Sequence, residues 1–281
     1  MDTQTILVTG STGKTGRRIV ERLRALGRPV RSGSRSARPS FDWEDRGTWR
    51  DALDGVSAAY ICYYPDIAAP GAAKTIQAFV ERAADCGVRR LVLLSGRGEP
   101  EARRCEQIVR ASGLESTVLR ASWFAQNFSE NFLLDPVLGG EVALPVGDVG
   151  EPFVDAEDIA DVAVAALTQP GHSGQLYELT GPRLLTFAEA VAEIGRASGR
   201  VVRYVRIPVE DYAASLRGAQ VPDEVVEALT YLFAEVLDGR NASVADGVQR
   251  ALGRAPGDFT AYAEATAATG TWDAVPTPAM R

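Results

Sequence analysis

The 281-residue chain contains little lysine, histidine or cysteine. Lysine occurs only at positions 14 and 74, although lysine and arginine together number 30. There is one histidine, and the three cysteines form no C-x-x-C pair, so no group of residues has the spacing of a metal site. Sparse cysteines indicate free thiols in a reducing compartment. We therefore expect neither a metal centre nor a disulfide framework.

Features of membrane and nucleic-acid-binding proteins are also absent from the sequence. No apolar run reaches the ~18 residues of a membrane span, and no signal peptide precedes the first apolar segment. A net charge of −7 argues against nucleic acid as a partner, because phosphate binding requires a basic surface. We expect a cytoplasmic protein, monomeric or homodimeric, whose partner is a small-molecule substrate.

Three glycines spaced G-x-x-G-x-x-G follow the apolar run 5–9, and a segment with helical spacing of apolar residues comes next. In such a strand–loop–helix unit the first glycine permits a tight turn, the second lets a pyrophosphate approach the backbone, and the third lets the helix pack on the sheet. The helix N-terminus favours an anion. This pattern predicts a dinucleotide site, with a ligand-free structural turn as the alternative. The site residues are Gly10, Thr12, Gly13, Lys14, Thr15 and Gly16.

Strand-like and helix-like segments alternate over the first 180 residues, which predicts an α/β fold with a doubly wound parallel sheet of the Rossmann type. We expect strands at 5–9, 29–34, 57–63, 90–95, 116–121 and 175–180, and helices at 71–86, 101–113 and 157–168. Further helices are expected at 186–197, 208–217, 222–237, 243–252 and 258–268, a short strand at 201–207, and a frayed end at 275–281. The whole chain, 1–281, then forms one unit. Residues 1–185 are its dinucleotide-binding core, and 186–281 a smaller, mostly helical region that caps the substrate.

The segment after the second strand indicates which nucleotide binds. A carboxylate there accepts hydrogen bonds from the adenosine ribose, whereas an arginine accommodates a 2′-phosphate. No acidic residue occurs between Val30 and Asp42, and Arg35 stands where the strand should end. This predicts NADP(H) in preference to NAD(H), although Arg35 could be an ordinary surface charge. Asp42 is a candidate acceptor for the adenine amino group, or else a helix or turn cap.

Several ordered motifs extend over nearly the whole chain. They are Ile6-Leu-Val-Thr-Gly-Ser-Thr-Gly-Lys-Thr-Gly16, Ala52-Leu-Asp-Gly-Val56, Gly87-Val-Arg-Arg-Leu-Val-Leu-Leu-Ser95, Trp123-Phe…Asn127, Pro152-Phe-Val-Asp-Ala-Glu-Asp-Ile-Ala160 and Leu176-Tyr-Glu-Leu-Thr-Gly181. In these motifs the sequence resembles the NmrA-like branch of the atypical short-chain dehydrogenases/reductases. The resemblance implies a Rossmann-type domain with a smaller C-terminal substrate region. Members of this branch include quinone and azo-compound reductases, reductases of iminium or enone intermediates, and non-catalytic redox-sensing regulators.

The sequence departs from the wider superfamily at one point. Typical members use a Tyr-x-x-x-Lys pair, in which lysine lowers the tyrosine pKa for proton transfer. No tyrosine here is followed by lysine four residues later, and alignment on Glu106 places Gly98 and Ala102 at the two positions. Proton transfer must then come from another group or from water, or is not needed.

Three residues are candidates for catalysis. Ser95 ends the fourth strand, where the superfamily often has a catalytic serine or threonine; a helix or turn cap is the alternative. Tyr63 follows the third strand and either donates a proton or lines the cofactor site, as Ser95 also would. Asn127 could orient a substrate or cap a helix. The aromatic side chains of 123–128 suit a flat substrate or simply core packing.

Two charged residues just past Ser95 are weaker candidates. Arg97 and Glu99 could be polar groups of the pocket, whereas exposed loop charges are the simpler interpretation. Together these features predict an NADPH-dependent reductase of a small, flat, electron-poor compound, such as a quinone, enone, iminium ion or carbonyl, in specialised metabolism. The alternative is a regulatory protein that senses NADP(H) without catalysis.

Overall fold

The computed structural model describes residues 5–273, so the expected frayed end at 275–281 lies outside the described residues. The chain forms two compact units. The first contains the chain up to Ser122, together with Ala156–Thr180 and Ala245–Pro256, and the second contains Trp123–Asp155, Gly181–Val244 and the chain from Gly257 onward. This division differs from the expected boundary at 185, because each unit recruits segments from both sides of it.

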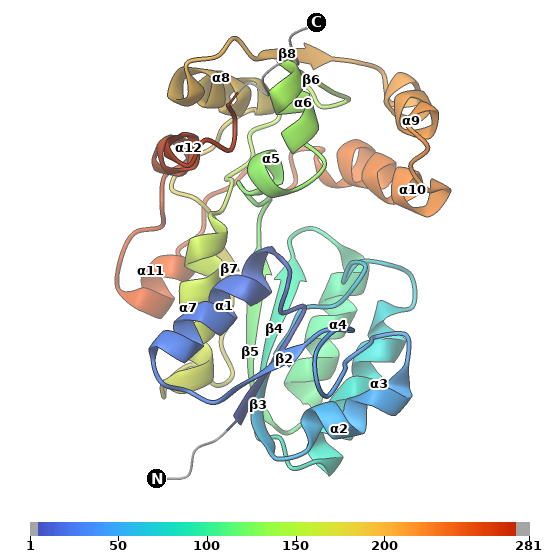
Figure 1. Cartoon of the computed structure of the whole chain (residues 1–281), viewed down its shortest axis with the longest axis vertical. Coiled ribbons are helices and arrows are strands. Elements are labelled where there is room, and N and C mark those ends of the chain that lie inside the picture. The colour runs from blue at the N-terminus through green and yellow to red at the C-terminus, as the bar shows by residue number, and fades with distance from the viewer. Residues whose placement is uncertain (1–4, 274–281) are drawn as a thin grey trace, which may run out of the picture. The chain divides into compact units, whose positions relative to one another are not determined.

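The first unit is built on a six-stranded parallel sheet with the strand order β2-β1-β3-β4-β5-β7 (Figure 1). The strands are β1 (Thr5–Thr9), β2 (Val30–Gly33), β3 (Val56–Ile61), β4 (Arg90–Gly96), β5 (Glu115–Ala121) and β7 (Leu176–Leu179). Buried apolar side chains dominate the central strands β1, β3 and β4, because both faces of the sheet are covered there. The expected doubly wound α/β fold is confirmed.

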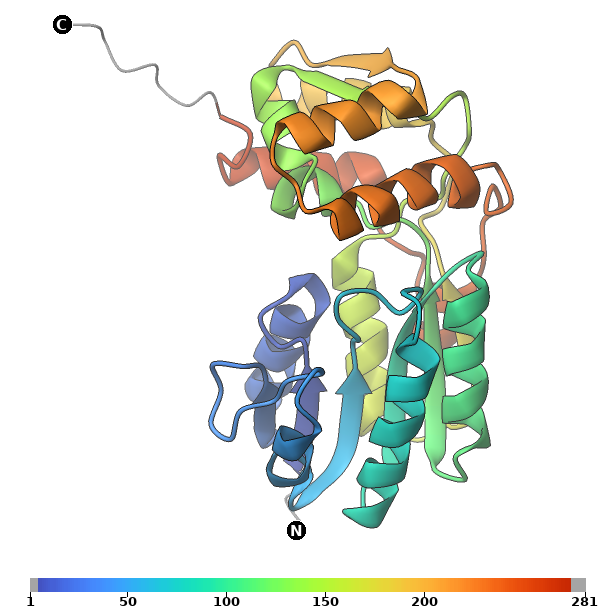
Figure 2. The same cartoon turned by 90° about the vertical axis from the view of Figure 1, so that its right-hand side faces the viewer.

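Helices cover both faces of this sheet (Figure 2). They are α1 (Lys14–Ala25), α2 (Trp49–Leu53), α3 (Ala72–Asp85), α4 (Pro100–Ala111), α7 (Ala156–Thr168) and α11 (Gly247–Leu252), with a short 3-10 turn, η1 (Arg46–Thr48), before α2. Helices α1 and α7 pack together on one face, and α3 and α4 pack together on the other. Helix α11 lies against β7, which explains why 245–256 belongs to the first unit.

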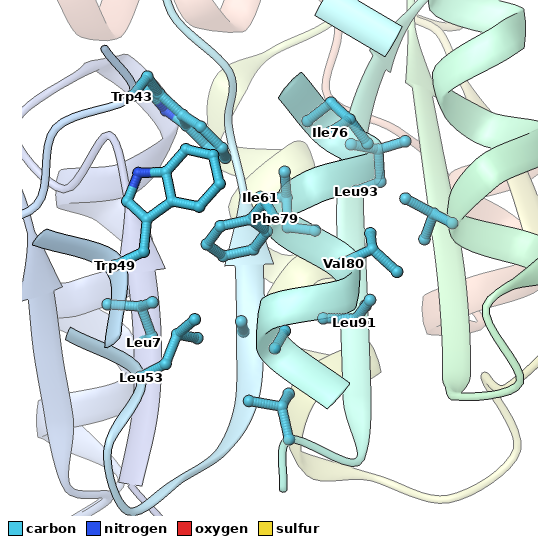
Figure 3. Packing of buried hydrophobic residues seen from close by; sticks show 14 of the residues in the cluster. Leu7, Trp43, Trp49, Leu53, Ile61, Ile76, Phe79, Val80, Leu91 and Leu93 are labelled. Atoms are coloured by element: carbon cyan, nitrogen blue, oxygen red, sulfur yellow. The ribbon is translucent and has the colours of Figure 1, made fainter. Parts of the chain in front are cut away.

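The core between the sheet and α3 is continuous (Figure 3). Leu7, Ile61 and Leu91 come from three neighbouring strands and share one hydrophobic cluster with Phe79 of α3, and all four side chains are completely buried. Trp43 and Trp49 extend this core: Trp49 meets Trp43 and Phe79 edge to face, and Trp43 packs against Phe79 at a tilt. The packing holds the ends of β1, β3 and β4 in fixed positions.

The second unit combines a small parallel sheet with helices. Its elements are α5 (Asn127–Glu130), α6 (Leu134–Gly139), β6 (Glu141–Leu144), α8 (Phe187–Ser198), β8 (Arg203–Arg206), α9 (Val209–Gly218), α10 (Asp223–Tyr231), the π-helical turn η2 (Leu232–Val236) and α12 (Phe259–Ala268). Strand β6 pairs with β8, which ties 123–155 to the later helices. The sequence patterns did not predict β6, α5 or α6. The helix expected over 222–237 is α10 followed by η2.

Within residues 5–273, no helix combines the length and the apolar character needed to cross a bilayer. The same part of the chain contains no group of three or more His, Cys, Asp or Glu residues placed to hold a metal ion.

Candidate functional site

The candidate site lies at the carboxyl ends of β1, β3 and β4. These strands are neighbours and run parallel, so the loops that follow them meet at one edge of the sheet. Strands β2 and β3 lie on opposite sides of β1, which makes this edge the point where the strand order reverses. Ligands of doubly wound sheets bind at such a point. The three loops are therefore where a dinucleotide would be held.

The loop between β1 and α1 has a geometry that requires glycine at two of its three glycine positions. Gly10 has a φ of +62°, a left-handed conformation that side chains disfavour. A Cβ on Gly16 would lie 2.1 Å from the carbonyl oxygen of Gly10, so any larger residue would force the helix away from the loop. The tight turn and the close helix packing expected from the sequence are both present.

The glycine loop also presents groups that suit an anion. The N-cap residue of α1 is Gly13, which has no side chain to cap the helix, and no acidic residue occupies its first turn. Ser11 is only 7% exposed, yet its Oγ has no hydrogen-bond partner among residues 5–273. A buried hydroxyl normally has a partner. A phosphate oxygen would supply it, so the residues present fit a dinucleotide.

A buried hydrogen-bond network connects this loop to the neighbouring strand β3. The Tyr60 hydroxyl donates to Thr15 Oγ1 at 3.0 Å, and Thr9 Oγ1 donates to the Tyr60 carbonyl oxygen at 3.0 Å. The backbone N–H of Cys62 in turn donates to Thr9 Oγ1 at 2.9 Å. These bonds join the ends of β1 and β3. The hydroxyl of Thr15 thus accepts a hydrogen bond within the fold and its contact with a cofactor stays a prediction, whereas Thr12 and Gly13 are exposed at the loop surface.

The residues expected at the adenosine end lie in the segment after β2. Arg35 is exposed and forms no ion pair with the described residues, whereas Lys14 is half-buried at the start of α1. Asp42 Oδ1 accepts from the backbone N–H of Glu44 at 3.1 Å, the turn-capping role considered as its alternative. A contact of Asp42 with adenine stays a prediction.

Tyr63, the first of the three catalytic candidates, is half-buried after β3. Its ring meets that of Trp43 edge to face, with centroids 5.1 Å apart, which places the side chain against the core. This position suits a wall of the site. Its role in proton donation stays a prediction.

Ser95 is held in a buried polar network at the end of β4. Its hydroxyl donates to Glu106 Oε1 at 2.7 Å, and Glu106 is paired with Arg120 of β5. Arg120 also binds Glu178 of β7 at 2.7 Å. The hydroxyl therefore already has a protein acceptor. The sequence patterns did not reveal this network, because its members are far apart in the chain.

The two charged residues in the loop after β4 are not exposed, although exposure was the simpler interpretation of their sequence position. Arg97 and Glu99 are both buried, with 8% and 5% of their surface exposed. Arg97 reaches Glu178 at 3.4 Å. Burial, and to a smaller degree the negative charge of Asp66, raise the pKa of Glu99 to about 8.

Asn127 and the aromatic residues near it belong to the second unit. Asn127 is the first residue of α5, and its backbone N–H donates to the Phe124 carbonyl oxygen at 3.1 Å. Phe128 is fully buried among other phenylalanines, so it is part of the core. Trp123 packs against Phe187 and nearby rings. A role of Asn127 in orienting a substrate stays a prediction.

Comparison with known proteins identifies the family. A model of the NmrA-like family matches residues 103–255, and an NAD(P)H azoreductase of Xenophilus azovorans is 31% identical over 94% of this chain and 98% of its own length. A (4-alkanoyl-5-oxo-2,5-dihydrofuran-3-yl)methyl phosphate reductase of Streptomyces griseus subsp. griseus is 35% identical over 89% of this chain and 93% of its own. The chain belongs to the NmrA-like family.

Solved structures share the fold of this NmrA-like chain. The NADPH-dependent quinone oxidoreductase of Escherichia coli, in its complex with NADPH, has a TM-score of 0.75 at 21% identity and covers 92% of this chain and 99% of its own. Alignment on Glu106 places Gly98, in the loop before α4, and Ala102, buried in α4, at the tyrosine and lysine positions, and that the pair is missing from the site stays a prediction. Neither can transfer a proton from its side chain.

Proposed function

We propose that this chain is an NADPH-dependent reductase that transfers a hydride to a small, flat, electron-poor organic substrate. The chain is an oxidoreductase of the NmrA-like family, and the two relatives described above are both reductases. The observation that carries the proposal is the glycine loop, where the Ser11 hydroxyl, which has no hydrogen-bond partner among residues 5–273, lies beside the N-terminus of α1 with glycine as its N-cap. NADPH supplies the hydride, and the protein binds and orients the reactants.

Each part of the cofactor has candidate partners in the first unit. The Ser11 hydroxyl and the backbone of Gly13 hold the pyrophosphate at the start of α1, with Lys14 adding positive charge. Arg35 binds the 2′-phosphate, because it is exposed, forms no ion pair with the described residues and is followed by no acidic residue before Asp42. These contacts favour NADP(H) over NAD(H).

The substrate class follows from the chemistry that the site lacks. Without a tyrosine–lysine pair, the acid–base couple by which typical superfamily members activate an ordinary alcohol or ketone is not available. Quinones, enones and iminium ions accept a hydride readily because they are already electron-poor. We therefore place the substrate among these compounds and related conjugated carbonyls.

Titration with NADPH, NADP+, NADH and NAD+ tests the cofactor assignment. Replacing Arg35 by Ala should raise the Kd of NADPH about tenfold, equivalent to about 1.4 kcal/mol, and leave that of NADH unchanged. Arg38→Ala is the matched control, because Arg38 is exposed in the same segment and donates to the neighbouring Ala37 carbonyl oxygen. Binding of none of the four below the millimolar range would contradict the proposal.

A second candidate function is a regulator that senses NADP(H) without catalysis. The same missing tyrosine–lysine pair favours it. A sensor would bind the oxidised and reduced cofactors tightly and with similar affinities, but would consume no NADPH. Incubation with menadione, methyl red, 2-cyclohexenone and a dihydroisoquinolinium salt separates the two functions. NADPH oxidation that depends on any of these acceptors supports the reductase.

A further inference from the structure

The side chain of Glu99 is buried but unpaired among residues 5–273. Glu99 precedes α4 and is only 5% exposed. Its carboxyl forms no hydrogen bond or ion pair with the residues that the structure describes, and although Glu99 is the N-cap residue, its side chain does not cap the helix. An ionised carboxylate in such surroundings is unfavourable relative to the neutral acid. Glu99 is therefore arranged to hold a proton.

The backbone of the same loop makes room for this carboxyl group. A Cβ on Gly96, the last residue of β4, would lie 2.4 Å from Glu99 Oε2. The carboxyl thus folds back toward Gly96 at the carboxyl end of β4. This is the edge of the sheet where doubly wound folds bind their ligands. The position places an acidic proton beside the candidate site.

The charges around Glu99 keep the proton in place. Asp66, in the segment after β3, is the charged group whose field acts on Glu99. Burial first and this negative charge second raise the pKa of Glu99 from 4.5 to about 8. The nearby cation, Arg97, contacts Glu178 on β7. At neutral pH most molecules therefore carry a protonated Glu99.

We propose that Glu99 is the proton donor of the reductase, in place of the missing tyrosine–lysine pair; the proposal rests on the reductase function proposed above. The acceptor gains two electrons and one hydrogen as the hydride supplied by NADPH, and becomes an anion. The O–H bond of Glu99 then breaks, and its proton neutralises that anion. The Glu99 carboxylate takes up a proton from water. Each turnover consumes one NADPH and one proton.

This assignment predicts a difference between classes of acceptor. An enone or an azo compound becomes an anion when a hydride adds to it, so its reduction requires a proton. An iminium ion becomes a neutral amine and requires none. Loss of the Glu99 proton should therefore slow the first class and spare the second.

The test compares wild type, Glu99→Gln and the control Glu101→Gln. Glu101 lies two residues further along, in the first turn of α4, where it binds Arg104 and the backbone N–H of Ala73. Infrared difference spectra between wild type and Glu99→Gln, without any acceptor, should show a protonated carboxyl band that disappears with a midpoint near pH 8. The Glu101→Gln protein should retain that band. Its absence from wild type at pH 7 would overturn the proposal.

Kinetics with 2-cyclohexenone, methyl red and the dihydroisoquinolinium salt provide the second readout. With the first two, wild-type kcat should fall as the pH rises through about 8, and Glu99→Gln should lower kcat at pH 7 about a hundredfold or more with an unchanged Kd for NADPH. With the iminium salt, kcat should stay within about threefold. Equal kcat values for wild type and Glu99→Gln with all acceptors would overturn the assignment of Glu99 as proton donor and leave the reductase function in place. A wild type that binds NADPH but reduces no acceptor would overturn the reductase function as well.

Discussion

Two buried glutamates near the end of β4 have opposite surroundings. Glu106 is 3% exposed and binds both Ser95 and Arg120, whereas Glu99 is 5% exposed and has no such partner in the described chain. A buried charge is tolerated when an opposite charge and hydrogen bonds replace water. A buried carboxyl without them is stable only as the neutral acid. Burial alone therefore does not distinguish a structural carboxylate from a proton donor; its partners do.

The largest effect expected from this comparison is a pH dependence of stability that Glu99 causes. The folded state raises the pKa of Glu99 from 4.5 to about 8, so between these values the folded protein holds a proton that the unfolded chain has lost. The free energy of unfolding should consequently fall as the pH rises through this window, by up to about 1.4 kcal/mol per pH unit, and level off above it. Urea denaturation from pH 5 to 9 measures this slope. The Glu99→Gln protein should lack this contribution, and parallel curves for the two proteins would show that Glu99 ionises normally.

Removing the charge of Glu106 should destabilise the protein at neutral pH. Glu106→Gln leaves Arg120 with Glu178 as its carboxylate partner and takes the charged acceptor from Ser95, so we expect a loss of roughly 3 kcal/mol in the free energy of unfolding. Glu115→Gln is the control, because Glu115 forms an exposed pair with Arg90 and should cost less than about 1 kcal/mol. If urea denaturation gave similar losses in the free energy of unfolding for both variants, the buried Glu106 would contribute no more to stability than the exposed pair of Glu115.

A smaller effect is expected from Ser95→Ala. This change removes the hydrogen bond to Glu106 but keeps the pairing of Glu106 with Arg120, so stability should fall by about 1 kcal/mol. If the hydroxyl serves the network, kcat should change less than about threefold. Thermal denaturation and steady-state kinetics on the same preparation decide this. A large fall in kcat at unchanged stability would instead assign Ser95 to the substrate.

The smallest change in stability is expected from Gly96→Ala. The new methyl group would meet the flexible end of Glu99 and not the backbone, so the carboxyl should move at a cost within about 1 kcal/mol. The displaced acid should become more solvated and its pKa should fall, which lowers kcat for acceptors that need a proton. Combining this change with Glu99→Gln should add no further loss of kcat, as for two changes that act on one interaction. Additive losses would mean that Gly96 acts independently of Glu99.

The sequence predicts the sheet and the glycine loop well because both depend on local patterns. Apolar runs separated by helical periodicity place all six strands of the first unit to within a few residues. The spacing of Gly10, Gly13 and Gly16 predicts a turn whose close contacts the structure shows. The division into units was less predictable, because β6 pairs with β8 across about 60 residues and α11 returns to β7.

Local sequence determined the fold class, the position of the glycine loop and the absence of a tyrosine–lysine pair. Only the tertiary structure decided which polar residues near β4 have partners. Glu99 and Glu106 belong to the same short segment and have the same side chain. Arg120 and Glu178, which complete the ionic network around Glu106, come from β5 and β7. Because the pKa of a carboxyl depends on burial and on charges that distant segments bring to it, the sequence cannot reveal which glutamate retains a proton.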